Sequence, residues 1–351
     1  MKEKTPITIK DIARQTGLSK GTVDRVLHNR EGVSKKSYEK VMQAIREAGY
    51  KPNVYASLLA MHKDVVIAVI LPECIPGEFW SLAEAGIERA RGNAATFGVT
   101  ITRIDYNQYD LDSFRKACDK ALSLQPSGVV IAPMFKNETM LFTLRLQEKG
   151  IPYIYIDSKL EEDGYLAYFG MPMYQSGYLA ADLLTQGMPV SEVAIIRVRR
   201  DQQRQSDPTI NRRAGFMDYM MEHYPGAKVH SIFIAPDAPE ETARALDEFA
   251  AQHPDVRHVV MFNSRIHLIA PYLERIGASG KIRVVGFDNL ASNVAALQRG
   301  TVNVLIAQHP DEQASMAIQA LIDKTVFKKV PARRDNYMHM DILTRYNVEY
   351  Y

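Results

Sequence analysis

Apolar and polar residues follow one period up to about residue 63 and another beyond it. In the first part, apolar residues recur three and four positions apart, which is typical of amphipathic helices. This spacing predicts three short helices, within residues 8–17, 19–28 and 34–49. Three short helices with a tight turn between the first two form a helix-turn-helix module.

Residues that can cap these helices stand where the helices are predicted to begin. Thr8 and Asp11 have the spacing of a capping box, with Asp in place of the usual Glu. Ser19 and Ser34 are suited to cap the second and third helices. A fourth short helix, capped by Asn53, is predicted to follow.

From Val65 onward, short apolar runs alternate with amphipathic helical stretches. The strand candidates are residues 65–72, 99–106, 128–134, 151–157, 192–198, 228–235, 258–263, 281–288 and 301–308. Strands that alternate with helices indicate parallel sheets covered on both faces. These units are too many for one compact sheet, so we predict an α/β fold. It has two doubly wound parallel-sheet lobes, preceded by a small all-α head.

The charge is divided unevenly between the two parts. Residues 1–63 contain 13 lysines and arginines against 6 acids, whereas the remainder contains 30 against 35. A basic head on a mildly acidic body favours a polyanionic partner such as DNA for the head. A basic helical domain that is simply solvated is the alternative.

Other features place the chain among ordinary soluble proteins. The first residues are charged and lack the apolar core of a signal peptide, and no apolar run is long enough to cross a membrane. Cys74 and Cys118 lie far apart in the sequence and match no metal-binding spacing. We therefore expect a cytoplasmic protein with no membrane contact, metal or cofactor.

The second predicted helix has two distinct faces. Val23, Val26 and Leu27 form its inward face. Its outward face carries Lys20, Gly21, Asp24, Arg25 and His28. Recognition helices place such side chains against base edges, and nearby basic residues meet phosphates. Each charge alone is equally well explained by a solvated helix face, but the set favours a DNA reader.

Residues 8–59 resemble the head of the lactose-repressor (LacI/GalR) family of bacterial transcription regulators. The similarity rests on the "TV-x-RVL" core at 22–27, the "GY-x-PN" boundary at 49–53 and the short helix that follows. It implies that Leu59 enters the minor groove as a wedge, with packing on the body as the alternative. We predict that the DNA-contacting residues are Thr8, Ser19, Lys20, Gly21, Thr22, Asp24, Arg25, His28, Lys35, Asn53 and Leu59.

Asp24 departs from the family pattern, which usually has a small hydroxyl residue at this position. Its carboxylate can accept a hydrogen bond from a cytosine amine. It can also pair with Lys20 or His28 along the helix, or lower affinity by repelling phosphate. The intrahelical pair is the favoured interpretation.

Polar residues follow several predicted strands of the body, and ligands of open α/β sheets bind at the carboxyl ends of strands. Asp157, Asn263, Asp288 and Gln308 stand at such ends. Phe79 and Trp80 follow the first strand, and Arg212 opens a helix after a long loop. Carboxylates and amides with a flat aromatic ring suit a polyhydroxylated ligand. Helix capping or turn formation is the alternative role for each of these polar residues.

Residues 64–345 also resemble the effector domain of the same family, which is similar to periplasmic sugar-binding proteins. The matching motifs are "FW" at 79–80, "RRAGF" at 212–216, "VVGFDN" at 284–289 and "AQHP" at 307–310. The resemblance implies that the effector cleft is formed by Phe79, Trp80, Asp157, Arg212, Asn263, Asp288 and Gln308.

The expected domains are a helix-turn-helix head at 1–52, a hinge helix at 53–63 and an effector domain at 64–351. Within the effector domain, the first lobe is expected at about 64–166 and 309–337. The second is expected at about 167–308 and 338–351.

Two departures from the family pattern concern the effector. The segment "GMPMYQSG" lacks the Asp-Asn pair often found there, and Ser264 replaces an acid. The segment at 197–213 is rich in arginine and contains Arg197, Arg199, Arg200, Arg204, Arg212 and Arg213. This density suggests an anionic effector, such as a sugar acid or sugar phosphate. A solvated basic loop is the alternative.

The sequence lacks the phosphate-binding, dinucleotide-binding and hydrolase motifs of common enzymes. Asp157 and Asp288 could in principle be the paired carboxylates of a glycosidase. That function would not explain the basic head. A stand-alone sugar-binding protein would not need the head either. We therefore predict a homodimeric, ligand-responsive transcription regulator, more specifically a repressor, with operator DNA and a sugar, sugar acid or sugar phosphate as partners.

Overall fold

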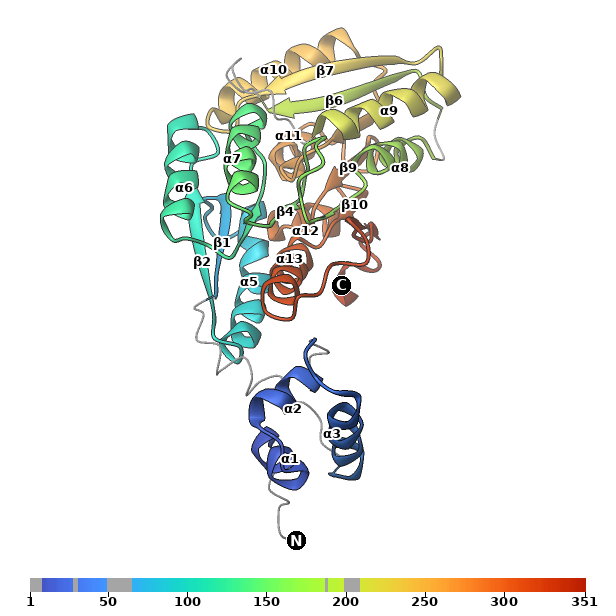
Figure 1. The fold of residues 1–351 in the computed structure, drawn as a ribbon. Helices are drawn as coiled ribbons and strands as arrows, with labels where there is room; N and C mark the ends of the chain where they lie inside the picture. Colours follow the sequence, from blue (N-terminus) through green and yellow to red (C-terminus); the bar gives the residue numbers. More distant parts are fainter. Residues whose placement is uncertain (1–7, 28–30, 49–64, 187–188, 199–208) are drawn as a thin grey trace. The chain divides into compact units, whose positions relative to one another are not determined.

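The structure is a computed structural model that describes residues 8–27, 31–48, 65–186, 189–198 and 209–351. The chain divides into two compact units, Met1–Lys63 and Asp64–Tyr351, coloured along the sequence in Figure 1. None of the helices in the described part of the chain is long and apolar enough to cross a lipid bilayer.

The first unit contains helices α1 (Ile9–Thr16), α2 (Lys20–Leu27) and α3 (Lys35–Ala48). Their apolar faces meet in a small core in which Ile12, Val23 and Val41 are completely buried. The predicted spacing of apolar residues therefore produces the predicted three-helix head, because each helix buries one face against the other two.

The caps predicted for the first three helices are present, whereas Asn53, predicted to cap a fourth, lies outside the described residues. The Asp11 carboxylate accepts hydrogen bonds from the Thr8 N–H at 2.9 Å and from the Thr8 hydroxyl at 2.6 Å. The Ser19 hydroxyl oxygen accepts the N–H of Thr22 at 3.1 Å, and Ser34 accepts an N–H at the start of α3 in the same way, at 3.2 Å. These bonds satisfy donors that a helix N-terminus otherwise leaves free.

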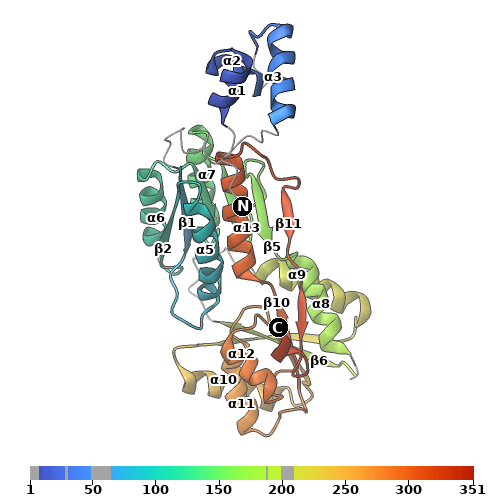
Figure 2. The same cartoon turned by 90° about the horizontal axis from the view of Figure 1, so that it is seen from below.

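The first lobe of the second unit is built on a six-stranded parallel sheet in the order β2-β1-β3-β4-β5-β11. Its strands are β1 (Val65–Pro72), β2 (Val99–Tyr106), β3 (Gly128–Ile131), β4 (Tyr153–Ile156), β5 (Ala167–Gly170) and β11 (Asp335–Tyr337). Helices α5 (Phe79–Ala95) and α13 (Pro310–Thr325) pack side by side on one face. Helices α6 (Leu111–Ser123) and α7 (Lys136–Glu148) cover the other (Figure 2).

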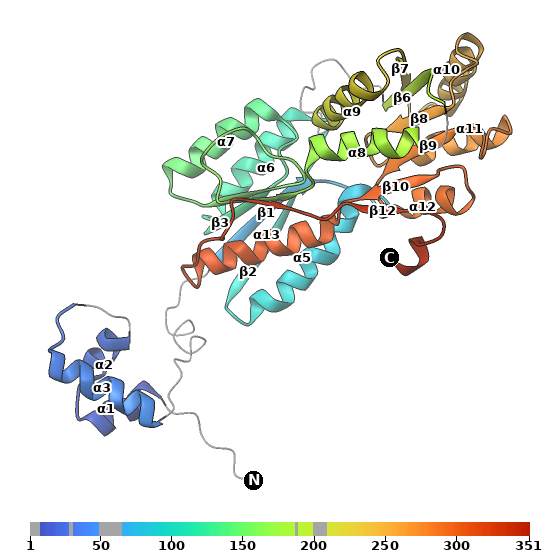
Figure 3. The same ribbon diagram turned by 90° about the vertical axis from the view of Figure 1, so that its right-hand side faces the viewer.

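The second lobe repeats this plan with the strand order β7-β6-β8-β9-β10-β12. Its strands are β6 (Glu192–Val198), β7 (Lys228–Ile234), β8 (His258–Met261), β9 (Arg283–Phe287), β10 (Val304–Ala307) and the antiparallel β12 (Asp341–Leu343). Helices α8 (Met173–Thr185) and α9 (Thr209–His223) lie against each other on one face (Figure 3). The other face is covered by α10 (Pro239–Gln252), α11 (Ala270–Arg275) and α12 (Ala291–Gln298).

The chain passes between the lobes three times, from β5 to α8, from β10 to α13 and from β11 to β12. The predicted architecture of two doubly wound lobes is confirmed. The first crossing was expected near residue 166, but β5 pairs with β4 and so extends the first lobe through Gly170. Strand β5 is fully buried and only four residues long, without a polar alternation that would mark it in the sequence.

Candidate effector cleft and DNA-binding face

The second unit contains a cavity of about 330 Å³ between its two lobes. It lies where the carboxyl ends of the strands of both sheets face each other, which is the usual ligand position in open α/β folds. All seven residues predicted from the sequence line it: Phe79, Trp80, Asp157, Arg212, Asn263, Asp288 and Gln308.

Asp157 and Asp288 occupy equivalent positions in the two lobes, directly after β4 and β9. Both have left-handed backbone conformations, with φ angles of 64° and 68°, which Asp tolerates better than most side chains. The Asp157 N–H donates to the Phe169 carbonyl, and the Asp288 N–H donates to the Ile306 carbonyl. Each carboxylate is therefore held at a strand end by the neighbouring strand.

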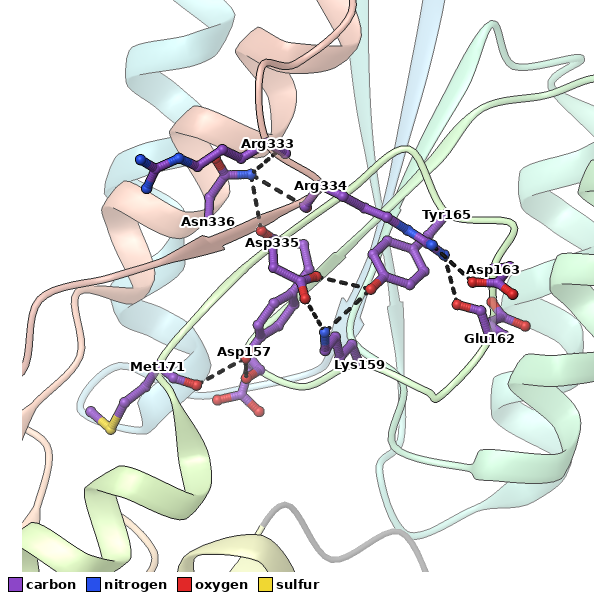
Figure 4. Close-up of polar contacts among 11 residues, drawn as sticks. Asp157, Lys159, Glu162, Asp163, Tyr165, Met171, Arg333, Arg334, Asp335 and Asn336 are labelled. Carbon is purple, nitrogen blue, oxygen red and sulfur yellow. Dashed lines mark hydrogen bonds and ion pairs between the residues drawn. The ribbon is translucent and has the colours of Figure 1, made fainter.

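A polar network fixes the chain around Asp157 (Figure 4). The Tyr168 hydroxyl donates to the Asp157 carbonyl at 2.8 Å and to the Met171 carbonyl at 3.1 Å. Beyond it, Lys159 forms an ion pair with Asp335 of β11. This network attaches the loop after β4 to the strand that leads into the third crossing, so it stabilises the first lobe beside the cleft.

Arg212 is the only one of the described arginines in its segment that enters the cleft, and it is only 3% exposed. Its guanidinium group donates to the Phe262 carbonyl at 2.8 Å and lies 4.3 Å from the centre of the Phe287 ring. Among the described residues, its Nε has no hydrogen-bond partner. A buried N–H without a partner is costly, so an oxygen acceptor that reached this donor would stabilise the site.

Two glycines allow α9 to place Arg212 this deeply. A Cβ atom at Gly177 of α8 would lie 1.7 Å from the Arg212 carbonyl oxygen, and one at Gly215 of α9 would lie 2.0 Å from the Tyr174 carbonyl oxygen. Only glycine permits this approach of the two helices. The close packing of α8 on α9 thus sets the position of the cleft arginine.

Buried amides connect the cleft residues to one another. The Gln308 Nε2 group donates to the Asp288 carboxylate at 2.9 Å, whereas its Oε1 has no partner in the part of the chain that the structure describes. Gln313 of α13 accepts the Asp157 N–H at 3.0 Å and donates to the Gln308 carbonyl at 2.8 Å. Gln313 therefore joins the strand end of one lobe to the second crossing.

Burial changes the acidity of both cleft carboxyls. Burial raises the pKa of Asp157 to about 7, an effect opposed by Arg212 and increased by Asp288. Burial likewise raises the pKa of Asp288 to about 6, opposed by Arg212 and by the hydrogen bond from Gln308. A shift in this direction means that Arg212 and Gln308 do not fully compensate the burial of two negative charges.

The aromatic pair contributes in unequal ways. Phe79 and Trp80 contact each other edge to face, with ring centroids 5.0 Å apart. Trp80 is 6% exposed and belongs to the core of the first lobe, whereas Phe79 is half-buried. Phe79 therefore offers the more accessible ring for stacking on a ligand.

The structure also brings residues to the cleft that the sequence did not single out. The Arg265 guanidinium of the second lobe donates to the Tyr109 hydroxyl of the first lobe at 3.3 Å and lies 3.9 Å from the Glu78 carboxylate. The Arg265 N–H is held by the Asn263 side chain at 2.9 Å. These contacts span the cleft between lobes, and no local sequence pattern predicts them; their only sequence signal is proximity to strand ends.

Most of the described arginines of the arginine-rich segment lie outside the cleft. Arg197 stacks on Phe233 at 4.9 Å, and Arg197 and Arg213 border a separate surface pocket. Arg199, Arg200 and Arg204 lie outside the described residues. The cavity lining contains Glu78, Asp157, Asp237 and Asp288 as acids, and Arg212 and Arg265 as arginines.

In the head, the predicted reading face is accessible. Lys20, Gly21, Arg25 and Lys35 are exposed, as are Thr8 and Ser19. Thr22 and Asp24 are half-buried. The Ser19 and Thr22 hydroxyl groups are 2.9 Å apart and share a hydrogen bond.

The remaining predicted DNA contacts, His28, Asn53 and Leu59, lie outside the described residues, as does the hinge helix. Asp24 is not without an interaction partner, and the preference for an intrahelical pair over a base contact remains a prediction.

Comparison with known proteins agrees with both parts of the chain. Residues 8–53 match the model of the lacI family of bacterial regulatory proteins, and residues 67–329 match the model of a periplasmic binding protein domain. A crystal structure from Bacteroides fragilis, assigned as a LacI transcriptional regulator, is 37% identical. It covers 82% of this chain and 100% of that one, with a TM-score of 0.77.

Two further relatives extend the comparison. The ribose operon repressor of Halalkalibacterium halodurans is 26% identical over 81% of this chain and 80% of its own length. The transcriptional regulator RegA of Clostridium saccharobutylicum is 25% identical over 55% of this chain, and the match spans only 56% of that relative.

A helix-turn-helix head followed by a two-lobed, sugar-binding-like domain defines a ligand-responsive DNA-binding regulator. The chain belongs to the lacI family of bacterial regulatory proteins. It is a DNA-binding transcriptional regulator and not an enzyme, so the glycosidase alternative for Asp157 and Asp288 is excluded.

Proposed function

We propose that the protein is a homodimeric repressor that acts in the cytoplasm and whose affinity for operator DNA is set by a carbohydrate bound in the cleft. The observation that carries the proposal is the group formed by Asp157, Arg212 and Asp288. Two buried carboxylates accept hydroxyl hydrogen bonds, and the guanidinium group of Arg212, which lines the cleft, donates to a ring or hydroxyl oxygen. The 26% identical ribose operon repressor supports both the sugar class and the repressor role.

The described lining favours a neutral sugar over an anion. Its four carboxylates outnumber its two arginines. A carboxylate or phosphate on the ligand would have to lie near Asp157 and Asp288, and like charges at short range are unfavourable in a buried site. The anionic effector suggested by the arginine-rich segment therefore depends on the arginines outside the described residues.

The DNA-binding role assigns the exposed side of α2 to the major groove. Lys20, Gly21 and Arg25 are exposed there, while Val23 and Val26 hold the helix on the core of the head. Two heads in a dimer bind two half-sites of a pseudo-palindromic operator. A carbohydrate that closes the cleft changes the relation of the lobes, which in turn changes operator affinity.

Thermal shift measurements on the full chain test the effector class. Neutral pentoses and hexoses, sugar acids and sugar phosphates are compared for their effect on the melting temperature. We expect a neutral sugar to raise it, and we expect the rise to disappear in Asp288→Asn. Asp247→Asn is the matched control, since Asp247 is an exposed acid of the same lobe paired with Arg275.

The outcomes separate the two parts of the proposal. Stabilisation by sugar acids or phosphates alone would refute the neutral effector. Stabilisation that persists in Asp288→Asn would remove this residue from the site. The operator, first selected from randomised DNA with the full chain, is then used in gel-shift titrations. A sugar that stabilises the protein without changing operator affinity would refute the regulatory link, and light scattering that gives a monomer would refute the dimer.

A further inference from the structure

Within the ranges that the structure describes, three metal-ligating side chains converge far from the effector cleft: Glu192, His230 and His253. One Glu192 carboxylate oxygen lies 3.2 Å from the His230 Nε2 and 3.3 Å from the His253 Nδ1. All three donor atoms lie within 4.8 Å of one another. Their side chains are 15%, 21% and 27% exposed, respectively, so solvent reaches the group from one side.

The fold brings these residues together from three elements. Glu192 begins β6, and its side chain lies on the same face of the sheet as Ala194, which pairs with His230 of β7. His253 follows directly after α10, which covers that face. The two imidazole rings pack against each other with centroids 3.9 Å apart and planes tilted by 39°, and the Phe249 ring lies 4.6 Å from His253 and 5.8 Å from His230. The donors are thus held by packing before any ligand arrives.

The spacing fits a tetrahedral transition metal. With metal–ligand bonds of about 2.0–2.2 Å, neighbouring donors of a tetrahedral zinc ion are about 3.4 Å apart. The two distances to the Glu192 oxygen are close to this value. Two imidazole nitrogens with one carboxylate suit Zn²⁺ and related ions, whereas Mg²⁺ and Ca²⁺ prefer oxygen ligands throughout.

We propose that Glu192, His230 and His253 form a binding site for Zn²⁺ or a similar divalent transition metal, with the fourth coordination position open to solvent. Among the described residues, Lys228 competes with a metal for this carboxylate, since its Nζ lies 3.7 Å from the other Glu192 oxygen. Its side chain is 73% exposed and can turn into solvent when the metal binds. A bound ion would join the edge strand β7 and its neighbour β6 to the end of α10.

This site is separate from the effector cleft. Glu192 is the first residue of β6 and Val198, which lines the cleft, is the last. Six residues of strand span roughly 20 Å. The metal therefore stabilises the second lobe from the opposite end of its sheet and does not take part in effector contacts.

Isothermal titration of the full chain, free of any histidine tag, with ZnCl₂ tests the proposal, with MgCl₂ as the comparison. We expect Zn²⁺ to bind and Mg²⁺ not to bind. His253→Gln and His230→Gln should each weaken zinc binding by more than about tenfold, since even outer-shell changes cost 10- to 100-fold at metal sites. His339→Gln is the matched control, because His339 is an exposed histidine outside the cluster, and it should bind zinc as the unmodified chain does.

Further measurements distinguish loss of the metal site from loss of the folded structure. Circular dichroism and metal-free melting identify variants that have lost their structure. Co²⁺ in place of Zn²⁺ should give visible absorption typical of tetrahedral coordination by the unmodified chain, and that absorption should be lost in Glu192→Gln. Zinc binding that is unchanged in folded His253→Gln and His230→Gln, or absence of zinc binding in the unmodified chain, would overturn the site and leave a histidine–carboxylate hydrogen-bonded group.

Discussion

Asp157 and Asp288 determine how the cleft responds to pH at the scale of single residues. Their pKa values in the folded protein, about 7 and about 6, lie above the usual value of 3.8. The folded state therefore binds more protons than the unfolded state between pH 4 and pH 7. Stability contributed by these groups is present at low pH and is lost as pH rises through that range.

Comparison with the double variant Asp157→Asn/Asp288→Asn isolates this effect. The free energy of unfolding of the effector-free protein should fall relative to that of the double variant as pH rises from 5 to 8. The relative loss is a few kcal/mol at most, because one pKa unit corresponds to about 1.4 kcal/mol. Urea unfolding at several pH values gives the free energy of unfolding of both proteins. The contributions of other titrating groups cancel when one value is subtracted from the other. A difference that does not vary with pH would contradict the raised pKa values.

Arg212 acts through both its charge and its shape. Its flat guanidinium group stacks on Phe287, donates to the Phe262 carbonyl and retains a free Nε in the described structure. Arg212→Lys keeps the charge but loses the plane and the fixed donors, so it should weaken binding of the stabilising sugar by more than about tenfold. Calorimetry measures the loss. Arg213→Lys, which changes the exposed neighbour, should bind the sugar normally; equal losses in both variants would point to disruption of α9 instead.

At the scale of elements, α2 gives a prediction about DNA affinity. Arg25 is exposed on the side of α2 away from the core of the head. If it contacts a base, Arg25→Ala should cost about 1–3 kcal/mol at the selected operator. Arg14→Ala is the control, since Arg14 is an exposed arginine on α1, beside Asp11. Gel-shift titration compares the two, and an unchanged affinity in Arg25→Ala would remove Arg25 from the interface.

Elements with strong local signals were predictable from the sequence, and elements that depend on distant partners were not. The caps at Thr8 and Ser19 and the long apolar strands follow from short-range patterns. Strands β5, β11 and β12 have three or four residues each and are strands because a neighbouring strand is present. The sequence pattern therefore predicts a boundary between the lobes a few residues before the one that the structure has.

The candidate cleft was predictable for a different reason. In a parallel sheet, residues that follow strands gather at one edge, so Asp157, Asn263 and Asp288 could be placed together without knowing their contacts. Arg265 and Tyr109 could not be found in this way, because their contact depends on how one lobe faces the other. Glu192, His230 and His253 are also distant from one another in the sequence, and they meet through the register of β6 with β7 and the packing of α10 on the sheet.

At the scale of the whole molecule, the division into two compact units predicts that the two activities can be separated. All the described residues that line the cavity belong to the second unit, and so do all the described residues of its hydrophobic cores. A chain that begins at Asp64 should therefore fold, bind the stabilising sugar with the affinity of the full chain and lose operator binding. Calorimetry and gel-shift titration measure the two properties on the same preparation. Operator binding retained by the shortened chain would show that residues outside the head contact DNA, and loss of sugar binding with intact circular dichroism would show that the head contributes to the effector site.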